Sequence, residues 1–391
     1  ERTENLGAAI VGAMRQIEIA NPDTLYGVLS MFSSQKWTNK AILNDSKIRD
    51  LIEHLSKRKL GNKDYPADLM GDAYEILLKK FADDSKAQAG EFYTPRSVVR
   101  LLVHILDPQP GETVYDPACG SGGMLIEAIR YMHDDSLCCG SIFGQEKNVV
   151  NAAIAKMNLF LHGASDFNVM QGDTLRDPKI LQGGNIAKFD CVIANPPFSL
   201  ENWGATEWSS DKYKRNIYGT PSDSCGDYAW IQHMICSMSS GKGRMAVVMP
   251  QGILFRGNQE AEIRKQLVES DLIEAVVTLG DKLFYGTGLS PCFLIIRRMK
   301  PAHHSGRILM IDGSKILTQK RAQNILEEND IDRLYSLYQN YSDEEDYSRI
   351  VTLQEIRDKE YNLSPNRYVV YHKEEIRPYV EVLAEFKQAY E

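Results

Sequence analysis

The sequence predicts an α/β fold in which a mostly parallel sheet of seven strands follows an all-α N-terminal region. Short runs of apolar, β-branched residues alternate with longer stretches in which apolar residues recur near every 3.6 positions. The first of these short runs is followed by a glycine-rich turn, and residues 1–85 contain no comparable run. We therefore expect a helical region at 1–85, an α/β domain at 86–330, and a C-terminal segment of loop and helix at 331–391 that is a candidate for docking a partner.

The composition is that of an ordinary globular protein. The 391 residues are 43% hydrophobic and 25% charged. No apolar run reaches 18 residues, so we predict no transmembrane helix and no membrane partner. The segment 1–5 resembles neither a signal peptide nor a native start, so we expect the helical region to be truncated at its start.

The cysteines and the net charge restrict the possible sites further. The seven cysteines follow no metal-ligand spacing, so we predict reduced thiols in a cytoplasmic protein and no metal site. The net charge of −8 is unusual for a nucleic-acid-binding protein, because phosphate contacts need clustered Lys and Arg. A basic face or a partner subunit would have to supply them.

Residues 1 to about 85 are expected to be helical. Apolar periodicity predicts helices at 42–60, which Gly61 would end, and at 68–81. A third helix is expected at 97–106, with Thr94 as its N-cap and Pro95 in its first turn. Phe92 and Tyr93, just ahead of this helix, could line a small-molecule pocket, although such residues more often belong to a core.

The first strand of the α/β domain ends at Asp116 and leads into a glycine-rich turn. A helix should begin near Gly122 or Gly123, so its N-terminal N–H groups would be free to bind a ligand. The glycines of the turn would let the backbone approach that ligand closely, as in Rossmann-like folds. The turn lacks both the dinucleotide fingerprint and the Gly-Lys-Ser/Thr of a phosphate loop. Since a carboxylate at Asp116 would repel phosphate and attract a cation, the turn favours a ligand with an adenosine part and a positive end.

The next two predicted strands also end in acids. The run 140–145 leads to Glu146, a position where an acid commonly binds ribose hydroxyls, and the strand at 168–175 carries Asp173, which could accept from an adenine amino group. Each acid alone is weak evidence. Acids stand at the tips of three successive predicted strands, and glycines lie beside the first of them. Together these features predict a nucleoside site.

The fourth strand, at 190–194, runs into Asn195-Pro196-Pro197-Phe198. Two prolines end the strand and stiffen the carbonyl geometry, so its tip carries a rigid amide and an aromatic ring. If the ligand carries a methylsulfonium, the Asn195 side-chain oxygen and the Pro196 carbonyl could accept hydrogen bonds from a nucleobase amine, which favours the tetrahedral nitrogen of the transition state. Phe198 could stack on an extruded base. The alternative is an ordinary turn after a strand.

The remaining pattern completes the sheet. Strands are expected at 244–250, 272–279, 291–298 and 306–312, with helices at 148–161, 227–238 and 260–269 and a final helix after Tyr368. The loop 199–225 interleaves Trp203, Trp208 and Arg215 with lysines and tyrosines. That mixture suits nucleic-acid contact, and a surface loop without such a role is equally compatible with it.

The motifs resemble those of a known enzyme family. Residues 116–123 and Asn195-Pro196-Pro197-Phe198 resemble motifs I and IV of amino-group DNA methyltransferases, and residues 90–96 resemble the motif X that precedes motif I in the gamma arrangement. The helical N-terminal region and the segment 361–368 resemble the modification subunit of type I restriction-modification systems. The resemblance implies a Rossmann-like S-adenosyl-L-methionine-dependent methyltransferase sheet.

The resemblance also implies roles for residues of this chain. Asn195, Pro196, Pro197 and Phe198 would hold the target adenine for N6 methylation. S-adenosyl-L-methionine would be bound by Glu91, Phe92, Tyr93, Thr94, Pro95, Arg96, Asp116, Ala118, Gly120, Ser121, Gly122, Gly123, Glu146 and Asp173.

The partners implied by the resemblance are double-stranded DNA with a flipped adenine, a specificity subunit shared by two modification subunits, and a restriction subunit. Three alternatives remain: methylation of an RNA base, methylation of a protein glutamine, and a non-catalytic module that binds S-adenosyl-L-methionine. Cys292 follows a proline, as does the nucleophile of cytosine-C5 methyltransferases, but its place in an apolar run favours a core thiol.

Overall fold

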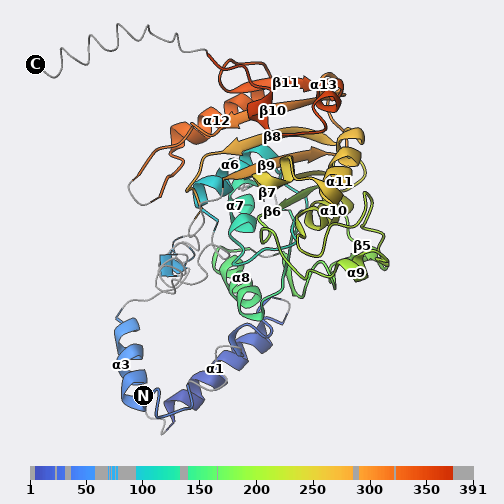
Figure 1. Ribbon diagram of the computed structural model, residues 1–391. Helices are drawn as coiled ribbons and strands as arrows, with labels where there is room; N and C mark the ends of the chain where they lie inside the picture. The colour runs from blue at the N-terminus through green and yellow to red at the C-terminus, as the bar shows by residue number, and fades with distance from the viewer. Residues whose placement is uncertain are drawn as a thin grey trace, which may run out of the picture.

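The fold is a nine-stranded α/β sheet covered by helices on both faces (Figure 1). The computed structural model describes residues 5–22, 24–30, 37–57, 69, 71, 73–74, 76–77, 94–132, 140–164, 166–284, 290–320 and 323–372. Among these residues, no helix is both long and apolar enough to cross a membrane.

The strand order is β11-β10-β8-β9-β7-β6-β1-β2-β3. The strands are β1 (Val114–Asp116), β2 (Ile142–Glu146), β3 (Phe167–Gln171), β6 (Cys191–Ala194), β7 (Arg244–Pro250), β8 (Ile273–Leu279), β9 (Pro291–Arg297), β10 (Arg307–Gly313) and β11 (Ser348–Thr352). Strand β9 runs antiparallel to both neighbours and β11 runs antiparallel to β10, whereas the other pairs are parallel. A separate hairpin joins β4 (Leu181–Gln182) and β5 (Asn185–Ile186).

The sheet is mostly parallel, as predicted, but it has nine strands where seven were predicted. Seven strands, β3 to β8 across the sheet, match the predicted runs. Strand β10, which the sequence pattern had indicated at 306–312, pairs with β8 and extends the sheet, and β11 pairs with β10 in turn. Strand β11 was missed because its residues, Ser348–Thr352, are mostly polar or charged. Strand β3 ends at Gln171, so Asp173 lies in the loop beyond it rather than within the predicted strand.

The helices lie in two layers. One face of the sheet is covered by α6 (Arg96–Leu106), α7 (Gly123–Met132), α8 (Val149–Leu161) and α12 (Glu328–Asn340); the other is covered by α10 (Asp227–Ser237), α11 (Asn258–Glu269) and α13 (Leu353–Asp358). Shorter elements are α9 (Ala205–Trp208), η1 (Gln251–Leu254), η2 (Ala302–His304) and η3 (Pro365–Arg367).

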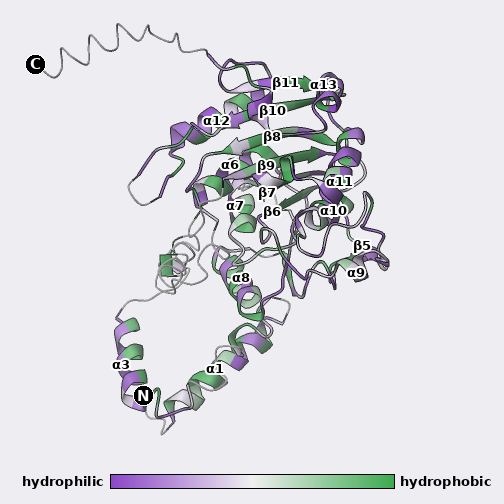
Figure 2. Cartoon of the chain, viewed as in Figure 1, coloured by the Kyte–Doolittle hydropathy of each residue, from purple (hydrophilic) through white to green (hydrophobic). Residues whose placement is uncertain are grey.

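Strand β6 shows why the central strands are apolar throughout. Its side chains alternate between faces, so Cys191 and Ile193 pack under α6, and Val192 and Ala194 pack toward α10. A parallel strand covered on both faces has no polar side. Figure 2 shows mostly hydrophobic colour along the strands of the sheet, whereas much of α11 and α12 is hydrophilic.

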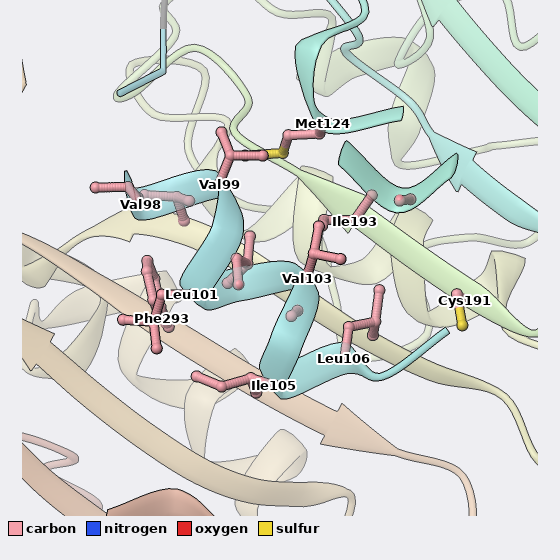
Figure 3. Close-up of a cluster of buried hydrophobic side chains, with 14 of the residues drawn as sticks. Val98, Val99, Leu101, Val103, Ile105, Leu106, Met124, Cys191, Ile193 and Phe293 are labelled. Atoms are coloured by element: carbon pink, nitrogen blue, oxygen red, sulfur yellow. The ribbon is translucent and has the colours of Figure 1, made fainter. Parts of the chain in front are cut away.

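Helix α6 packs directly above this strand. It buries the valine, leucine and isoleucine side chains of its inner face, and Figure 3 shows them against Met124, Ile193 and Phe293. The helix begins at Arg96, within one residue of the predicted start. Thr94, two residues before the helix, contacts Asn195 just beyond the end of β6.

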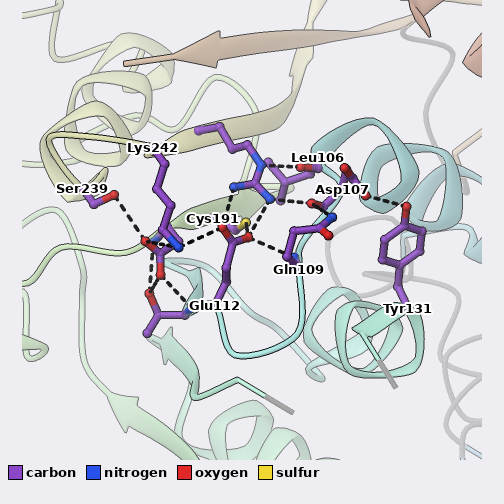
Figure 4. Close-up of polar contacts among 11 residues, drawn as sticks. Leu106, Asp107, Gln109, Glu112, Tyr131, Cys191, Ser239 and Lys242 are labelled. Atoms are coloured by element: carbon purple, nitrogen blue, oxygen red, sulfur yellow. Dashed lines mark hydrogen bonds and ion pairs between the residues drawn. The ribbon is translucent and has the colours of Figure 1, made fainter. Parts of the chain in front are cut away.

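The amino edge of the sheet is held by a buried ion pair. Glu112, just before β1, accepts from the Arg244 guanidinium at 2.7 and 3.2 Å, and Arg244 also donates to the carbonyl of Leu106 at the end of α6 (2.6 Å). Figure 4 shows Glu112 in contact with Gln109, Cys191 and Lys242 as well. This network joins the segment just before β1, the start of β7 and the end of α6 at the edge opposite the strand tips.

The N-terminal helices α1 (Leu6–Ala20) and α3 (Asp45–Leu55) lie beyond α8, away from the sheet (Figure 1). Helix α3 falls inside the predicted stretch 42–60, but it is shorter. The described residues before 78 contain helices and turns and no strand. Most of the helix predicted at 68–81, and the final helix after Tyr368, lie outside the described residues. The three-region division remains a prediction.

Candidate functional site

The tips of four neighbouring strands meet at the carboxyl edge of the sheet. Strands β6, β1, β2 and β3 are adjacent and parallel, with Asp116 beside Gly144, and Glu146 beside Gln171. Ligands bind beyond the carboxyl ends of the strands in open α/β sheets. The predicted residues Asp116, Glu146 and Asn195 therefore lie along one edge.

The glycine-rich turn after β1 lies against the tip of β2. The Gly120 N–H donates to Glu146 Oε2 at 3.0 Å, and the Cys119 N–H donates to the Gln145 carbonyl at 3.1 Å. Gly120 and Gly122 have φ values of 53° and 83°, which L side chains rarely adopt. A Cβ atom built on Gly120 would meet no atom within 4 Å, so its side of the turn is open.

Helix α7 begins at Gly123, as predicted, and its N-terminus faces the same edge. Gly123 also has open space where a Cβ atom would be. Ala118 and Ser121 are half-buried in the same turn. Unpaired N–H groups at a helix N-terminus and an open backbone are what a small polar ligand needs.

One buried and one half-buried carboxyl group lie under this turn. Asp116 is 2% exposed and accepts from the Ala118 N–H at 2.9 Å, and Glu146 Oε1 accepts from the Asn148 N–H at 2.7 Å. Burial raises the pKa of Asp116 to about 8, and the nearby Glu146 charge adds to the rise. Burial also raises the pKa of Glu146, against the backbone donors that lower it. Each group would become more acidic if a cation were placed beside it.

Asp173 makes contacts within the protein that the sequence did not indicate. It pairs with Lys147 at 2.9 Å, and its Oδ1 accepts from the N–H groups of Leu175 and Arg176 at 3.2 Å each. Its carboxylate therefore caps the turn after β3. It lies on the same edge as Glu146, because the Gly172 N–H donates to the Glu146 carbonyl at 2.9 Å.

Thr94 has a different role from the predicted N-cap. Pro95 is the N-cap residue of α6, and no side chain caps that end. The Thr94 hydroxyl instead accepts from Asn195 Nδ2 at 2.8 Å. The N-cap prediction for Thr94 was wrong because its hydroxyl is hydrogen-bonded to Asn195, which lies 101 positions away in the chain.

The contact to Thr94 orients the Asn195 amide at the tip of β6. With Nδ2 directed at Thr94, Oδ1 is buried and accepts no hydrogen bond from the part of the chain that the structure describes. A buried carbonyl without a donor costs roughly 1–3 kcal/mol, so most buried polar atoms of folded proteins have a partner. Among the described residues, Asn195 Oδ1 is thus a fixed acceptor without a donor.

The three residues after Asn195 form the rest of this tip. Pro196 is buried, Pro197 is exposed, and Phe198 is half-buried against the core. The Phe198 ring lies 6.3 Å from the Phe284 ring at an angle of 57°. Packing against Phe284 thus restrains the Phe198 ring.

The loop 199–225 corrects one part of the sequence interpretation. Trp203 and Trp208 are each 2% exposed and Arg215 is 1% exposed, so these residues are not available for nucleic acid. Arg215 stacks over the Trp208 ring at 4.4 Å and pairs with Asp211 at 2.8 Å. Composition could not distinguish this buried cation–π cluster from a binding surface. Lys212 and Lys214 remain exposed.

Other predicted site residues are placed as follows. Pro95 is half-buried and Arg96 is exposed at the start of α6, above the strand tips. Glu91, Phe92 and Tyr93 lie outside the described residues. Sequence reasoning missed Asp227 and Arg256, which contact the residue after Phe198. The sequence did show Asp227 at the start of an apolar helix. Its partners, Ser199 and Arg256, lie about 28 residues before and after it in the chain, so no local pattern indicated the contacts.

Comparison with known proteins gives one consistent family. The family model for N-6 DNA methylases matches residues 65–376. The MjaVII type I restriction enzyme methylase subunit of Methanocaldococcus jannaschii is 38% identical over 354 residues, which cover 87% of this chain and 59% of that protein. The HindI type I methylase subunit of Haemophilus influenzae is 31% identical, with 89% of this chain and 76% of that protein covered.

The fold has a solved counterpart. The type I restriction-modification system methyltransferase subunit from Streptococcus thermophilus superposes with a TM-score of 0.82 at 29% identity, covering 94% of this chain and 77% of that one. The chain spans 59%, 63% and 66% of the length of three M. jannaschii relatives.

Proposed function

Because the chain belongs to the N-6 DNA methylase family, we propose that it transfers a methyl group from S-adenosyl-L-methionine to the N6 amino group of adenine in DNA. The observation that carries this proposal is Asn195 Oδ1, a buried acceptor that has no donor among the described residues and lies at the tip of β6, next to the strand that leads into the acid-lined glycine turn. An adenine amine supplies the missing donor.

The residues at the turn fit the proposed cofactor. The open backbone at Gly120 and Gly123 admits a nucleoside, and the raised pKa values of Asp116 and Glu146 favour a ligand that brings positive charge. When bound, S-adenosyl-L-methionine supplies a methyl group activated by a sulfonium. Glu146 has acceptor capacity left for ribose hydroxyls, because each of its oxygens has two lone pairs.

Asn195 and Pro196 act on the nucleophile. The adenine amine is weakly nucleophilic because its lone pair is conjugated with the ring. Hydrogen bonds to Asn195 Oδ1 and the Pro196 carbonyl favour the tetrahedral nitrogen, so they strengthen as the methyl group transfers. The hydrogen bond to Thr94 holds the amide in place beforehand, which limits reorganisation.

The pH dependence of cofactor binding should reveal the Asp116 carboxyl. A positively charged ligand prefers ionised Asp116, and the ionised fraction rises as the pH passes through about 8. The affinity of the wild type relative to Asp116→Asn should therefore rise about tenfold from pH 7 to pH 9, since one ionisation accounts for the difference. Calorimetry on both proteins measures this ratio and cancels the titration of the ligand itself. A flat ratio would show that Asp116 does not face the positive charge.

Phe198 should tolerate only an aromatic replacement. If the extruded adenine stacks on its ring, Phe198→Ala should lower kcat/KM for DNA by about 5- to 150-fold, which corresponds to roughly 1–3 kcal/mol of stacking. Phe198→Trp should retain most of the activity. Methyl-transfer kinetics on the two variants test this, and equal losses would argue against stacking.

The partners are part of the same proposal. A net charge of −8 is compatible with a partner that supplies part of the phosphate binding, as expected if a specificity subunit reads the DNA. We propose two copies of this chain on one specificity subunit, a restriction subunit in the complete assembly, and a flipped adenine as substrate. The cytoplasm, where such a complex meets DNA, is the proposed location.

Tritiated methyl transfer tests the proposed function. Label from S-adenosyl-L-methionine should enter unmethylated genomic DNA when the chain is co-expressed with a specificity subunit, and RNA and protein should stay unlabelled. Label in RNA or in protein would contradict the proposal. Cofactor binding without transfer to any of the three would indicate the non-catalytic module instead.

A further inference from the structure

Ser199, the residue after Phe198, has an unusual backbone conformation. Its φ is 50°, in the left-handed region that residues with side chains seldom occupy. The N–H of Ser199 and the carbonyl of Phe198 belong to one planar peptide group. Whatever holds the Ser199 N–H therefore also fixes the backbone of Phe198.

Asp227 holds that N–H group. It is the first residue of α10 and is 0% exposed, and its Oδ1 accepts from the Ser199 N–H at 2.7 Å. A carboxylate at a helix N-terminus is favoured by the helix dipole, but a buried charge also needs a partner. The next residue of the loop is held at the same place, because the Gly226 N–H donates to the Leu200 carbonyl at 3.0 Å.

Arg256 is the partner of Asp227, and it also contacts Ser199. Its Nη1 lies 2.7 Å from Asp227 Oδ2, and its Nη2 donates to Ser199 Oγ at 3.3 Å. The side chain comes from the loop after η1, beyond the tip of β7, which is the neighbour of β6. Ser199, Asp227 and Arg256 thus form a closed ring of contacts.

The same guanidinium satisfies the acidic groups around it. Cys225, Asp227 and Glu260 place ligand atoms within 4.8 Å of one another, which resembles a cation site. Arg256 Nη1 lies 3.1 Å from Cys225 Sγ and 3.4 Å from Glu260 Oε1, so its positive charge occupies the centre of this group. A side chain bound on this many sides has a fixed orientation, although 31% of it is exposed.

We infer that Asp227 and Arg256 are positioning residues that hold the Phe198–Ser199 peptide so that the Phe198 ring is fixed before the adenine arrives. Neither residue needs to touch the cofactor or the base. The inference rests on the proposed function, since the ring is fixed for the sake of the adenine. It explains why a charged pair is built beneath an exposed, strained serine.

The variants separate this role from simple stability. Arg256→Met removes the charge at similar length, and Asp227→Asn keeps the shape of the buried side chain while removing its charge. Arg256→Lys restores a charge near Asp227 without the planar fork that also reaches Ser199. The matched control is Arg357→Met, which breaks another Arg–carboxylate pair, to Glu269, on the outer surface.

Two readouts are needed on the complex with the specificity subunit. Amide hydrogen exchange of residues 195–204 should accelerate by about tenfold or more in Arg256→Met and less in Asp227→Asn, because the ordered loop opens locally. With the same variants, kcat for methyl transfer to genomic DNA should fall by about tenfold or more, while KM for DNA and the Kd for S-adenosyl-L-methionine change by less than about threefold. Arg256→Lys should recover part of both effects, and Arg357→Met should show neither.

Three results would overturn the inference. Unchanged exchange with a lower kcat would mean that the pair acts by another route, and faster exchange with an unchanged kcat would mean that loop order is irrelevant. A higher KM alone would make Arg256 a DNA contact. If the wild type transfers no methyl group to DNA, the proposed function fails, and the exchange experiment still decides whether the pair holds the loop.

Discussion

Replacing Asn195 by alanine should lower the rate of methyl transfer to DNA by about 10²–10³-fold, the loss that follows removal of one preorganised transition-state partner. The Asn195 amide is oriented by Thr94, and its Oδ1 is a buried acceptor that has no donor among the described residues. The adenine amine would lose this acceptor in the variant. Binding of S-adenosyl-L-methionine should change little, because Asn195 follows β6, whereas the proposed cofactor residues Asp116 and Glu146 lie at the tips of β1 and β2. Single-turnover transfer and calorimetry measure the two effects.

Two further variants give the control. Thr94→Val removes the acceptor of the Asn195 amide without changing the amide itself, so it should reduce transfer less than Asn195→Ala does. Asn168→Ala makes the same substitution at an exposed position of β3 and should leave transfer unchanged. Retained turnover in Asn195→Ala would refute the role assigned to this residue.

Replacing Glu112 by glutamine should destabilise the fold by about 3–5 kcal/mol, the usual cost of removing one partner of a buried ion pair. Glu112 and Arg244 are 6% and 7% exposed, and the guanidinium would remain buried without its carboxylate. The pair ties β1, β7 and the end of α6 together at the edge opposite the site (Figure 4). Urea unfolding at pH 7 measures the change in the free energy of unfolding.

The pH dependence of this difference checks its origin. Burial alone would raise the pKa of Glu112, but hydrogen bonds from Arg244 and Gln109 outweigh it and lower that pKa to about 2, from an ordinary 4.5. A carboxyl group with a lowered pKa stabilises the fold above its ordinary pKa, and this stabilisation is lost as the pH falls toward 2. The gap between wild type and Glu112→Gln should therefore narrow from pH 5 downward. A constant gap would assign the loss to packing.

The fold could be predicted where a strand is buried on both faces. The apolar runs at β1, β6, β7 and β8 are unambiguous because both faces of each strand are covered. The order of the strands in the sheet could not be predicted in this way. That β9 inserts between β7 and β8 depends on pairing between distant segments. Strand β11 has only two apolar residues, Ile350 and Val351, which is too short a run to indicate a strand.

The site was predictable by residue type and only partly by role. Asp116, Glu146 and Asn195 were identified because strand tips share an edge. Two features depend on long-range contacts that override local rules: Thr94 does not cap α6, and Trp208 and Arg215 are buried, which removes one of the two interpretations of their loop. Asp227 and Arg256 were missed for the same reason, since neither residue is unusual until Ser199 is placed beside them.

The central claim is that Asn195 and Phe198 present an adenine amine for methylation. The most direct test is to digest the labelled DNA to nucleosides and identify which one carries the tritium after transfer by the chain with its specificity subunit. The account predicts that the label is in N6-methyldeoxyadenosine. Label in N4-methyldeoxycytidine or 5-methyldeoxycytidine would contradict it.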